Sequence, residues 1–363
     1  MNKKVLVVVV IAILLAIPAT LMITSGELFP PENPPYRVAI ISDYSNTETI
    51  YVHNGVAGVE KAARSSDTPI EPALYMAADR EYDSYMIAFE EAIADGYDLI
   101  VAPGYDAVEA AIATAWNHPE VEFLTIDATV DEYPPNFANI IFRSNEPSFV
   151  AGYLAGMMTE SRAIGYLGGV KIDSVTLFYY GFRAGIDLAI LERDESIRLV
   201  DVYADTFADE ELGYTLTDAM YRNGVDNVFT VAGNTGLGGI QAAKDKNKYV
   251  IGVDVDQNYL APKNVICSVV KDLIGITATI VVDYAHGVDY GGGPISTGYK
   301  EGALHVASII DDVPDDLKED AAKLEYALSM NLFDIPKTEA EYHSWAPARA
   351  AAILSESQEN YEE

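Results

Sequence analysis

Polar residues stand where several apolar, strand-like runs of the sequence end. Asp43 follows RVAIIS, Asp127 follows FLTI and Asp254 follows VIGV. Lys271 comes directly after VICSVV. Ligands of open parallel sheets lie beyond the carboxyl ends of the strands, so these side chains are candidates for one shared site. Three carboxylates and one ammonium supply hydrogen bonds and charge without a nucleophile beside a base, which indicates a binding pocket rather than a catalytic centre.

A glycine-rich stretch, VAGNTGLGGIQAAKD at residues 231–245, also follows an apolar run. A dinucleotide-binding loop has the pattern G-x-G-x-x-G, but after Gly236 and Gly238 the third position is Gln241. A Walker A phosphate loop has a lysine after its last glycine, and here Gly239 takes that position. Neither motif is present, so the stretch predicts a turn into a helix whose backbone can approach a ligand.

The sequence lacks the patterns of common catalytic and metal sites. Its five histidines include no H-E-x-x-H motif and no pair at i, i+4 spacing, so a zinc site has little support. No G-x-S-x-G elbow of a hydrolase is present. We therefore expect neither an enzyme nor a metal-binding protein.

Composition sets the broad class of the protein. The chain has 363 residues, 50% of them apolar, which is enough for two domains with cores of their own. Its formal net charge is −33, from 56 acidic and 23 basic residues. Nucleic acid is an unfavourable partner for such a chain, because both carry negative charge. We interpret the acidic excess as a solvated, self-repelling surface.

The N-terminal segment predicts a membrane anchor or a secretory signal. MNKK precedes an uncharged run at residues 5–23, which as a helix would be about 28 Å long, close to the thickness of a bilayer core. The basic start is expected to stay in the cytoplasm, which places the rest of the chain outside. The only cysteine is Cys267, so N-terminal thiol lipidation and an intrachain disulfide are excluded. The length favours an uncleaved anchor at residues 1–24, with secretion as the alternative if it is cleaved, and residues 25–36 read as a proline-stiffened linker.

Short β-branched runs alternate with helical patterns from Arg37 onward. Such apolar strands, separated by helices, predict an α/β fold with parallel sheets that are covered on both faces, and their number over this length suggests two sheets. The expected strands are residues 37–43, 98–104, 122–128, 139–144, 162–169, 198–204, 227–233, 249–254 and 264–270.

Five motifs in order resemble one family. They are SNEPSFVAGYLAGMMTESRAIGYLGG, FYYGFRAGIDLA, TFADEELGYTLTDAMYRNGVDNVFTVAGNTGLGGIQAAKD, YVIGVDVDQ and VICSVVKD. The chain is similar, from about Arg37 to about Pro336, to the basic membrane protein family of purine-nucleoside-binding lipoproteins, which are substrate-binding components of ABC importers. NLFDIPKT resembles the closing strand of that family, whereas the C-terminal tail at residues 338–363 has no counterpart and reads as a solvated helix and a frayed end.

The resemblance implies a fold and a division of the chain. The fold is the type I periplasmic-binding-protein fold, with two Rossmann-like lobes, each built on a parallel sheet, joined by three hinge crossovers. Lobe 1 would contain residues 37–140 and 268–302, and lobe 2 residues 141–267 and 303–337.

The resemblance also implies roles for single residues. Tyr51 and Phe207 would stack on the two faces of the base, and Asp127 would hydrogen-bond the base. On the other side, Asp254 would hold the ribose hydroxyls and Lys271 would complete the ribose site.

Three further positions complete the predicted ligand-binding site. Asp43 matches the aspartate that ends the first strand of the family, and Gly233 would offer its backbone to the ligand. Residues 44–51 are one residue shorter than the corresponding segment of the family, and Asn46 is the candidate for recognition of the base edge there.

The implied function is binding without chemistry. Two lobes would close over a purine nucleoside outside the cytoplasm, and the protein would present it to an ABC permease while its N-terminal helix holds it to the membrane. Such a protein needs no cofactor. Two alternatives stay open at this point: a different flat heterocycle such as riboflavin as the ligand, and a sensor that signals through its membrane helix.

Overall fold

The computed structural model describes residues 34–43, 50–128 and 130–355. Residues 36–363 form one compact unit, which follows the unit Met1–Pro35. The predicted anchor at residues 1–24, most of the linker and Asn46 lie outside the described residues, as does the side chain of Tyr51. None of the helices in the described part is both long and apolar enough to cross a bilayer.

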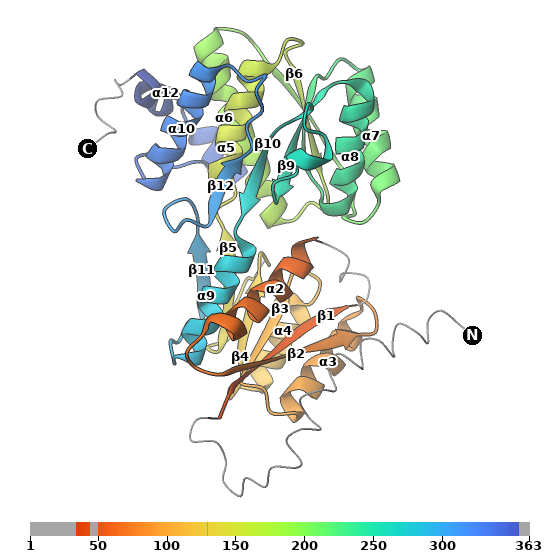
Figure 1. Ribbon diagram of the computed structural model, residues 1–363, viewed down its shortest axis with the longest axis vertical. Helices are drawn as coiled ribbons and strands as arrows, with labels where there is room; N and C mark the ends of the chain where they lie inside the picture. The colour runs from red at the N-terminus through yellow and green to blue at the C-terminus, as the bar shows by residue number, and fades with distance from the viewer. Residues whose placement is uncertain (1–33, 44–49, 129, 356–363) are drawn as a thin grey trace, which may run out of the picture. The chain divides into compact units, whose positions relative to one another are not determined.

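The first sheet, in lobe 1, has six parallel strands among the described residues, in the order β11-β5-β4-β3-β1-β2. Val38 and Ile40 face α2 and α9, whereas Ala39 and Ile41 face α3 and α4, so helices cover both faces of the sheet (Figure 1). The elements are β1 (Tyr36–Asp43), α2 (Ile50–Ser65), β2 (Ile70–Ala77), α3 (Tyr82–Ala94), β3 (Leu99–Pro103), α4 (Val108–Asn117), β4 (Glu122–Ile126), β5 (Phe137–Phe142), α9 (Leu273–Ala285) and β11 (Gly293–Thr297).

The second sheet, in lobe 2, has the order β12-β10-β9-β8-β6-β7, and its edge strand β12 is antiparallel to β10. Ile164 and Tyr166 face α5, α6 and α10, whereas Ala163 and Leu167 face α7 and α8. The elements are α5 (Asn145–Met158), β6 (Ala163–Gly168), α6 (Asp173–Arg193), β7 (Arg198–Tyr203), α7 (Glu210–Arg222), β8 (Asn227–Val231), α8 (Gly233–Lys246), β9 (Tyr249–Asp254), the 3₁₀ turn η1 (Asn258–Leu260), β10 (Val265–Lys271), β12 (Leu304–Ala307), α10 (Asp315–Ser329), α11 (Glu339–Ser344) and α12 (Ala348–Ser355).

The chain passes between the two sheets three times within the described residues: after β5, after β10 and after β11. These crossovers are tied together. Arg143 donates its backbone N–H to Thr297 O at 2.8 Å, and its side chain contacts Glu301 at 2.6 Å. Asp272 donates its N–H to Ala303 O at 2.8 Å. The predicted lobe boundary at residue 268 lies inside β10, which pairs with the second sheet as far as Lys271.

All nine expected strands are present, but one further expectation is wrong. NLFDIPKT, residues 331–338, forms no strand. Instead Phe333 and Ile335 are buried against lobe 2, and Asn145 Nδ2 donates to Ile335 O at 2.8 Å. The edge of the second sheet beside β10 is taken by β12, so this segment packs on helices rather than on the sheet.

The described part of the C-terminal tail is not the solvated helix that the sequence suggested. α11 packs against α6, and α12 packs against both α6 and α10. Trp345 meets Phe149 at 5.9 Å between ring centroids, and Ala350 and Ile353 are buried. Apolar side chains spaced through residues 345–354 supply a face that lobe 2 covers, so these residues belong to its core.

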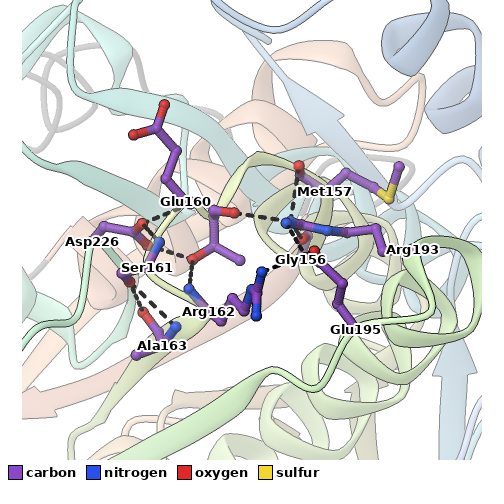
Figure 2. Close-up of polar contacts among 10 residues, drawn as sticks. Gly156, Met157, Glu160, Ser161, Arg162, Ala163, Arg193, Glu195 and Asp226 are labelled. Atoms are coloured by element: carbon purple, nitrogen blue, oxygen red, sulfur yellow. Dashed lines mark hydrogen bonds and ion pairs between the residues drawn. The ribbon is translucent and has the colours of Figure 1, made fainter.

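The connection from α5 to β6 is held by two charged side chains, at the end of the sheet that lies away from the carboxyl ends of the strands. Asp226 accepts hydrogen bonds from Thr159 Oγ1, Glu160 N and Ser161 N at 2.7–2.9 Å (Figure 2). Arg193 donates to three backbone carbonyls at the end of α5, which otherwise have no partner within the helix. These contacts are structural, because they satisfy backbone groups of the connection.

Glycines let the helices of lobe 2 approach closely. A Cβ at Gly185 of α6 would lie 2.0 Å from Phe149 O of α5, and one at Gly152 of α5 would lie 2.1 Å from Phe182 O of α6. Helices α7 and α8 also approach each other closely at a glycine, since a Cβ at Gly238 of α8 would lie 1.9 Å from Glu210 O of α7. In each case the obstacle is backbone, which cannot move aside as a side chain can.

We predict that Gly185→Ala destabilises the protein by about 1–3 kcal/mol, because the added methyl group forces α5 and α6 apart. Gly293→Ala is the matched control, because a Cβ at Gly293 meets no atom within 4 Å. Urea unfolding of both variants measures the difference. Equal midpoints for the two variants would contradict the close-packing explanation.

Candidate ligand-binding site

A cavity lies between the carboxyl ends of the two sheets. Its volume, which includes the open solvent at its mouth, is about 950 Å³. Lobe 1 contributes residues that follow β3 and β4, and lobe 2 contributes residues that follow β8, β9 and β10 together with the start of α6. The side chains on which the argument depends are Tyr105, Asp106, Asp127, Phe178, Phe207, Asp254 and Lys271.

Lys271 forms the polar centre of the cavity. Its Nζ lies 2.6 Å from Asp127 Oδ2 of lobe 1 and 3.6 Å from Asp254 Oδ1 of lobe 2. The side chains of Lys271 and Asp127 are only 3% and 7% exposed, whereas that of Asp254 is 20% exposed. Lys271 Nζ also lies 4.6 Å from the ring centroid of Phe178. The ammonium therefore connects the two lobes and is enclosed by carboxylates and an aromatic ring.

Both carboxylates are carried on unusual backbone. Asp127 is the first residue after β4 and has a φ of 53°. Asp254 is the last residue of β9 and has a φ of 67°. Aspartate tolerates this left-handed region better than most residues do, and such conformations gather at functional sites. Asp127 is held there because its N–H donates to Ile140 O at 2.8 Å and its Oδ1 accepts from Phe142 N at 3.2 Å.

The charges of the cluster shift each other's proton affinity. Burial raises the pKa of Asp254, and the nearby Asp127 raises it further, while Lys271 acts in the opposite direction. Burial alone would lower the pKa of Lys271, but the two carboxylates outweigh it and raise that pKa. The ammonium is therefore charged at neutral pH, and ionisation of Asp254 is less favourable than it is for an aspartate in water.

Aromatic side chains from both lobes meet in the cavity. Tyr105, two residues after β3, and Phe207, between β7 and α7, lie 5.8 Å apart between ring centroids at an interplanar angle of 61°. Phe178 of α6 is buried and also lines the cavity. A flat ligand entering here would meet aromatic surface on lobe 2 and on lobe 1.

The glycine-rich stretch has two separate roles. Gly233 lines the cavity, begins α8 with φ of 54° and lies close to Phe207. Gly238 and Gly239 lie inside α8, where they are buried against α7 and against Thr230 of β8. One glycine of the stretch therefore faces the ligand site, and those further along permit helix packing.

The structure brings five of the eight predicted binding residues to this cavity. They are Asp127, Phe207, Gly233, Asp254 and Lys271. Asp43 ends β1 nearby but is fully buried: its Oδ2 accepts from Tyr85 Oη at 2.8 Å, and it is not among the described residues that line the cavity. Tyr51 lies in the first turn of α2, with its side chain outside the described part, and Asn46 lies outside it altogether.

Tyr105, Asp106 and Phe178 are lining residues that the sequence did not single out. The signal for the first two was available, since they follow Gly104 at the end of an expected strand. The apolar spacing of the residues that follow suggests a helix here, but α4 begins only at Val108, so both residues stand in the turn before it. Phe178 carries no such signal, because it stands within the helical FYYGFRAG pattern.

The comparison with known families agrees with this architecture. A family model for PnrA-like ABC transporter substrate-binding proteins, named Bmp, matches residues 39–333. The chain belongs to the Bmp family. Basic membrane protein A1 of Borrelia garinii subsp. bavariensis is 29% identical over 314 residues, which cover 85% of this chain and 90% of that protein. Basic membrane protein A of Borreliella burgdorferi is 32% identical over 273 residues, covering 74% and 78% of the two chains.

Solved structures share the fold of this Bmp protein. An ABC transporter solute-binding protein from Aeropyrum pernix K1 superposes with a TM-score of 0.73 at 21% identity, covering 88% of this chain and 99% of that one. A transcriptional activator of the comK gene from Bacillus halodurans gives 0.70 at 16% identity, covering 83% and 99%. The predicted type I binding-protein fold is confirmed, and two-lobed proteins of different function have it.

Membership of the Bmp family establishes the general function. The chain is a substrate-binding protein of an ABC transporter and not an enzyme, so its partners are a small-molecule ligand and a permease. In open α/β sheets ligands bind beyond the carboxyl ends of the strands, which makes this cavity the candidate site.

We predict that Asp254→Asn keeps or raises the melting temperature of the unliganded protein at pH 7. The native-state pKa of Asp254 is raised, so its ionised form disfavours folding above the unfolded pKa of about 4. The difference should shrink as the pH falls through the raised pKa towards 4. Thermal unfolding at pH 7 and pH 4 checks this, with the exposed Asp131→Asn as control, and a large loss of stability at pH 7 would contradict it.

Proposed function

We propose that this Bmp protein binds a purine nucleoside between its two lobes, outside the cytoplasm, and delivers it to an ABC permease. The observation that carries the proposal is the composition of the cavity: aromatic rings together with two carboxylates grouped around one buried lysine. A nucleoside has the matching features, a flat base and a ribose with two adjacent hydroxyl donors. The uncharged run at residues 5–23 would tether the protein to the membrane.

Asp254 is the group best suited to the ribose. Its ion pair with Lys271 is long, at 3.6 Å, whereas Asp127 is in direct hydrogen-bond contact with the same ammonium at 2.6 Å. Asp254 is also the more exposed of the two carboxylates. An ionised carboxylate only accepts hydrogen bonds, and a ribose diol supplies two donors in adjacent positions. We assign Lys271 and Asp127 to the neighbouring ribose and base atoms.

Phe207 would provide one face of the base site. It is half-buried at the cavity wall next to Gly233, and its contact with Tyr105 keeps aromatic surface on both lobes together. The resemblance to the family assigns the opposite face to Tyr51 and makes Asn46 the candidate for recognition of the base edge. Stacking of a base on an aromatic ring contributes about 1–3 kcal/mol and tolerates different bases.

The charge of the cavity favours nucleosides over nucleotides. Asp127 and Asp254 carry two negative charges against the single positive charge of Lys271, so the cluster is net negative. A phosphate group would meet carboxylates that repel it in a partly buried site.

Binding would proceed by hinge closure. The lobes are connected by the three crossovers, and Lys271 contacts Asp127 across them, so closure brings the walls of the cavity together. No cofactor takes part in this step, because the ligand is bound and released without reaction.

A thermal-shift panel on residues 31–363 tests the ligand class. At a concentration one hundred times the Kd, a nucleoside should stabilise the protein by about 2.7 kcal/mol, a shift of several °C. Adenosine, guanosine and inosine should produce the shift, and AMP, GMP, ribose and the free bases should produce much smaller ones. The proposal would be refuted if riboflavin alone produced a shift, or if none of the nucleosides produced one.

We predict that Phe207→Leu weakens nucleoside binding by about 5- to 150-fold, because the stacking contribution is lost while the apolar wall is kept. Tyr259→Leu is the matched control, since Tyr259 is 67% exposed and does not line the cavity. Isothermal titration with one nucleoside measures both. Equal affinities of the two variants would remove Phe207 from the site.

A further inference from the structure

The cavity wall of lobe 1 carries a second polar group, separate from the Lys271 cluster. Asp106 follows β3, lines the cavity and has a side chain that is 15% exposed. Arg80, in the loop after β2, places its Nε 4.0 Å from Asp106 Oδ2 and 3.8 Å from Asp43 Oδ1. Asp43 is in turn fully buried and hydrogen-bonded to Tyr85. The guanidinium is thus held from the interior by Asp43 and faces Asp106 at the cavity wall.

The strand order places this group relative to the proposed ribose site. Along the carboxyl edge of the first sheet, β4, β3, β1 and β2 follow one another, and they lead to Asp127, Asp106, Asp43 and Arg80 respectively. Neighbouring strands lie about 4.8 Å apart, so the ends of β4 and β3, which lead to Asp127 and Asp106, are adjacent along this edge. With the ribose at Asp254 and Lys271, a base that is hydrogen-bonded by Asp127 would turn one edge towards Asp106.

We propose that Asp106 recognises the edge of the base and gives the protein a preference for 6-oxopurine nucleosides, guanosine and inosine, over adenosine. The proposal rests on the nucleoside-binding function above. An ionised carboxylate accepts hydrogen bonds and donates none. The N1–H of guanine or hypoxanthine donates to such a group, and guanine adds its 2-amino group. Adenine N1 is itself an acceptor, so it forms no hydrogen bond with the carboxylate. The two acceptors repel each other, which disfavours the binding of adenosine.

Asp106 fits this role better than Asp43 does. Asp43 is 0% exposed and does not line the cavity, whereas the side chain of Asp106 is 15% exposed and does. Asp43 instead supports Arg80, which acts as a positioning residue for the Asp106 carboxylate. The charge of the guanidinium attracts both carboxylates, with its Nε 3.8 Å from Asp43 Oδ1 and 4.0 Å from Asp106 Oδ2.

Isothermal titration of the full-length chain with guanosine, inosine and adenosine tests the assignment. The wild type should bind guanosine and inosine about tenfold or more tightly than adenosine. Asp106→Asn should lose this preference, because an amide offers both a donor and an acceptor: the affinity for guanosine falls about tenfold, and that for adenosine stays or rises. Asp83→Asn, an exposed carboxylate of α3, should behave as the wild type.

Several results would overturn the assignment. A wild type without base preference, or one that prefers adenosine, contradicts it, and so does an Asp106→Asn variant that weakens all three nucleosides alike. Arg80→Lys provides a second test should Asp106→Asn fold poorly: nucleosides should still bind, with reduced selectivity, and unchanged selectivity would remove Arg80 from its positioning role. Absence of binding to every nucleoside would refute the proposed function itself, whereas binding without base preference refutes only the role of Asp106.

Discussion

The site depends on the burial of one ammonium group between two lobes. Lys271 is only 3% exposed, and a charge so buried is tolerated only where partners compensate for the lost water. Its partners, Asp127 and Asp254, stand at the ends of strands in different sheets, so the cluster assembles only when both lobes and all three crossovers are in place. Folding of either sheet alone would leave at least one of these charges without its partner.

The interior of the fold was predictable because its central strands are buried on both faces. Such strands read as continuous apolar runs, and eight of the nine expected strands lie inside a sheet with a neighbour on each side; the ninth, β7, is an edge strand. The strands that sequence reasoning missed, β2, β11 and β12, each lie at the edge of a sheet. Edge strands are half solvated, so their sequences carry polar residues and proline: β2 includes Glu71 and Pro72, and β12 has only four residues. The burial of the C-terminal helices was missed for a related reason, since their few apolar side chains are buried only by contact with lobe 2.

The candidate site was predictable to the extent that it is local in sequence. Asp127, Asp254 and Lys271 each follow an apolar run directly, and the position of a strand end is enough to bring them to one edge. Asp106 stands three residues beyond β3, in a segment whose sequence resembles the start of a helix. It reaches the cavity because the chain forms a turn there, and no sequence pattern predicts that turn. Phe178 depends on tertiary packing in the same way. For the glycines of residues 231–245 the error has the opposite sign, because a pattern that suggested ligand contact has a packing role. Gly238 allows α7 and α8 to approach each other closely.

The fold alone does not decide what the cavity binds, because solute-binding proteins and a transcriptional activator have the same architecture. Which ligand the cavity binds depends on how its polar groups are arranged before the ligand enters. In this chain the unfavourable steps, the desolvation of Lys271 and the left-handed backbone of Asp127 and Asp254, are completed on folding. An incoming ligand then meets carboxylates already oriented by the protein, so less of its binding free energy is spent on ordering them. Such a site favours a ligand that donates hydrogen bonds and carries no negative charge, and it does so through groups that also hold the lobes together.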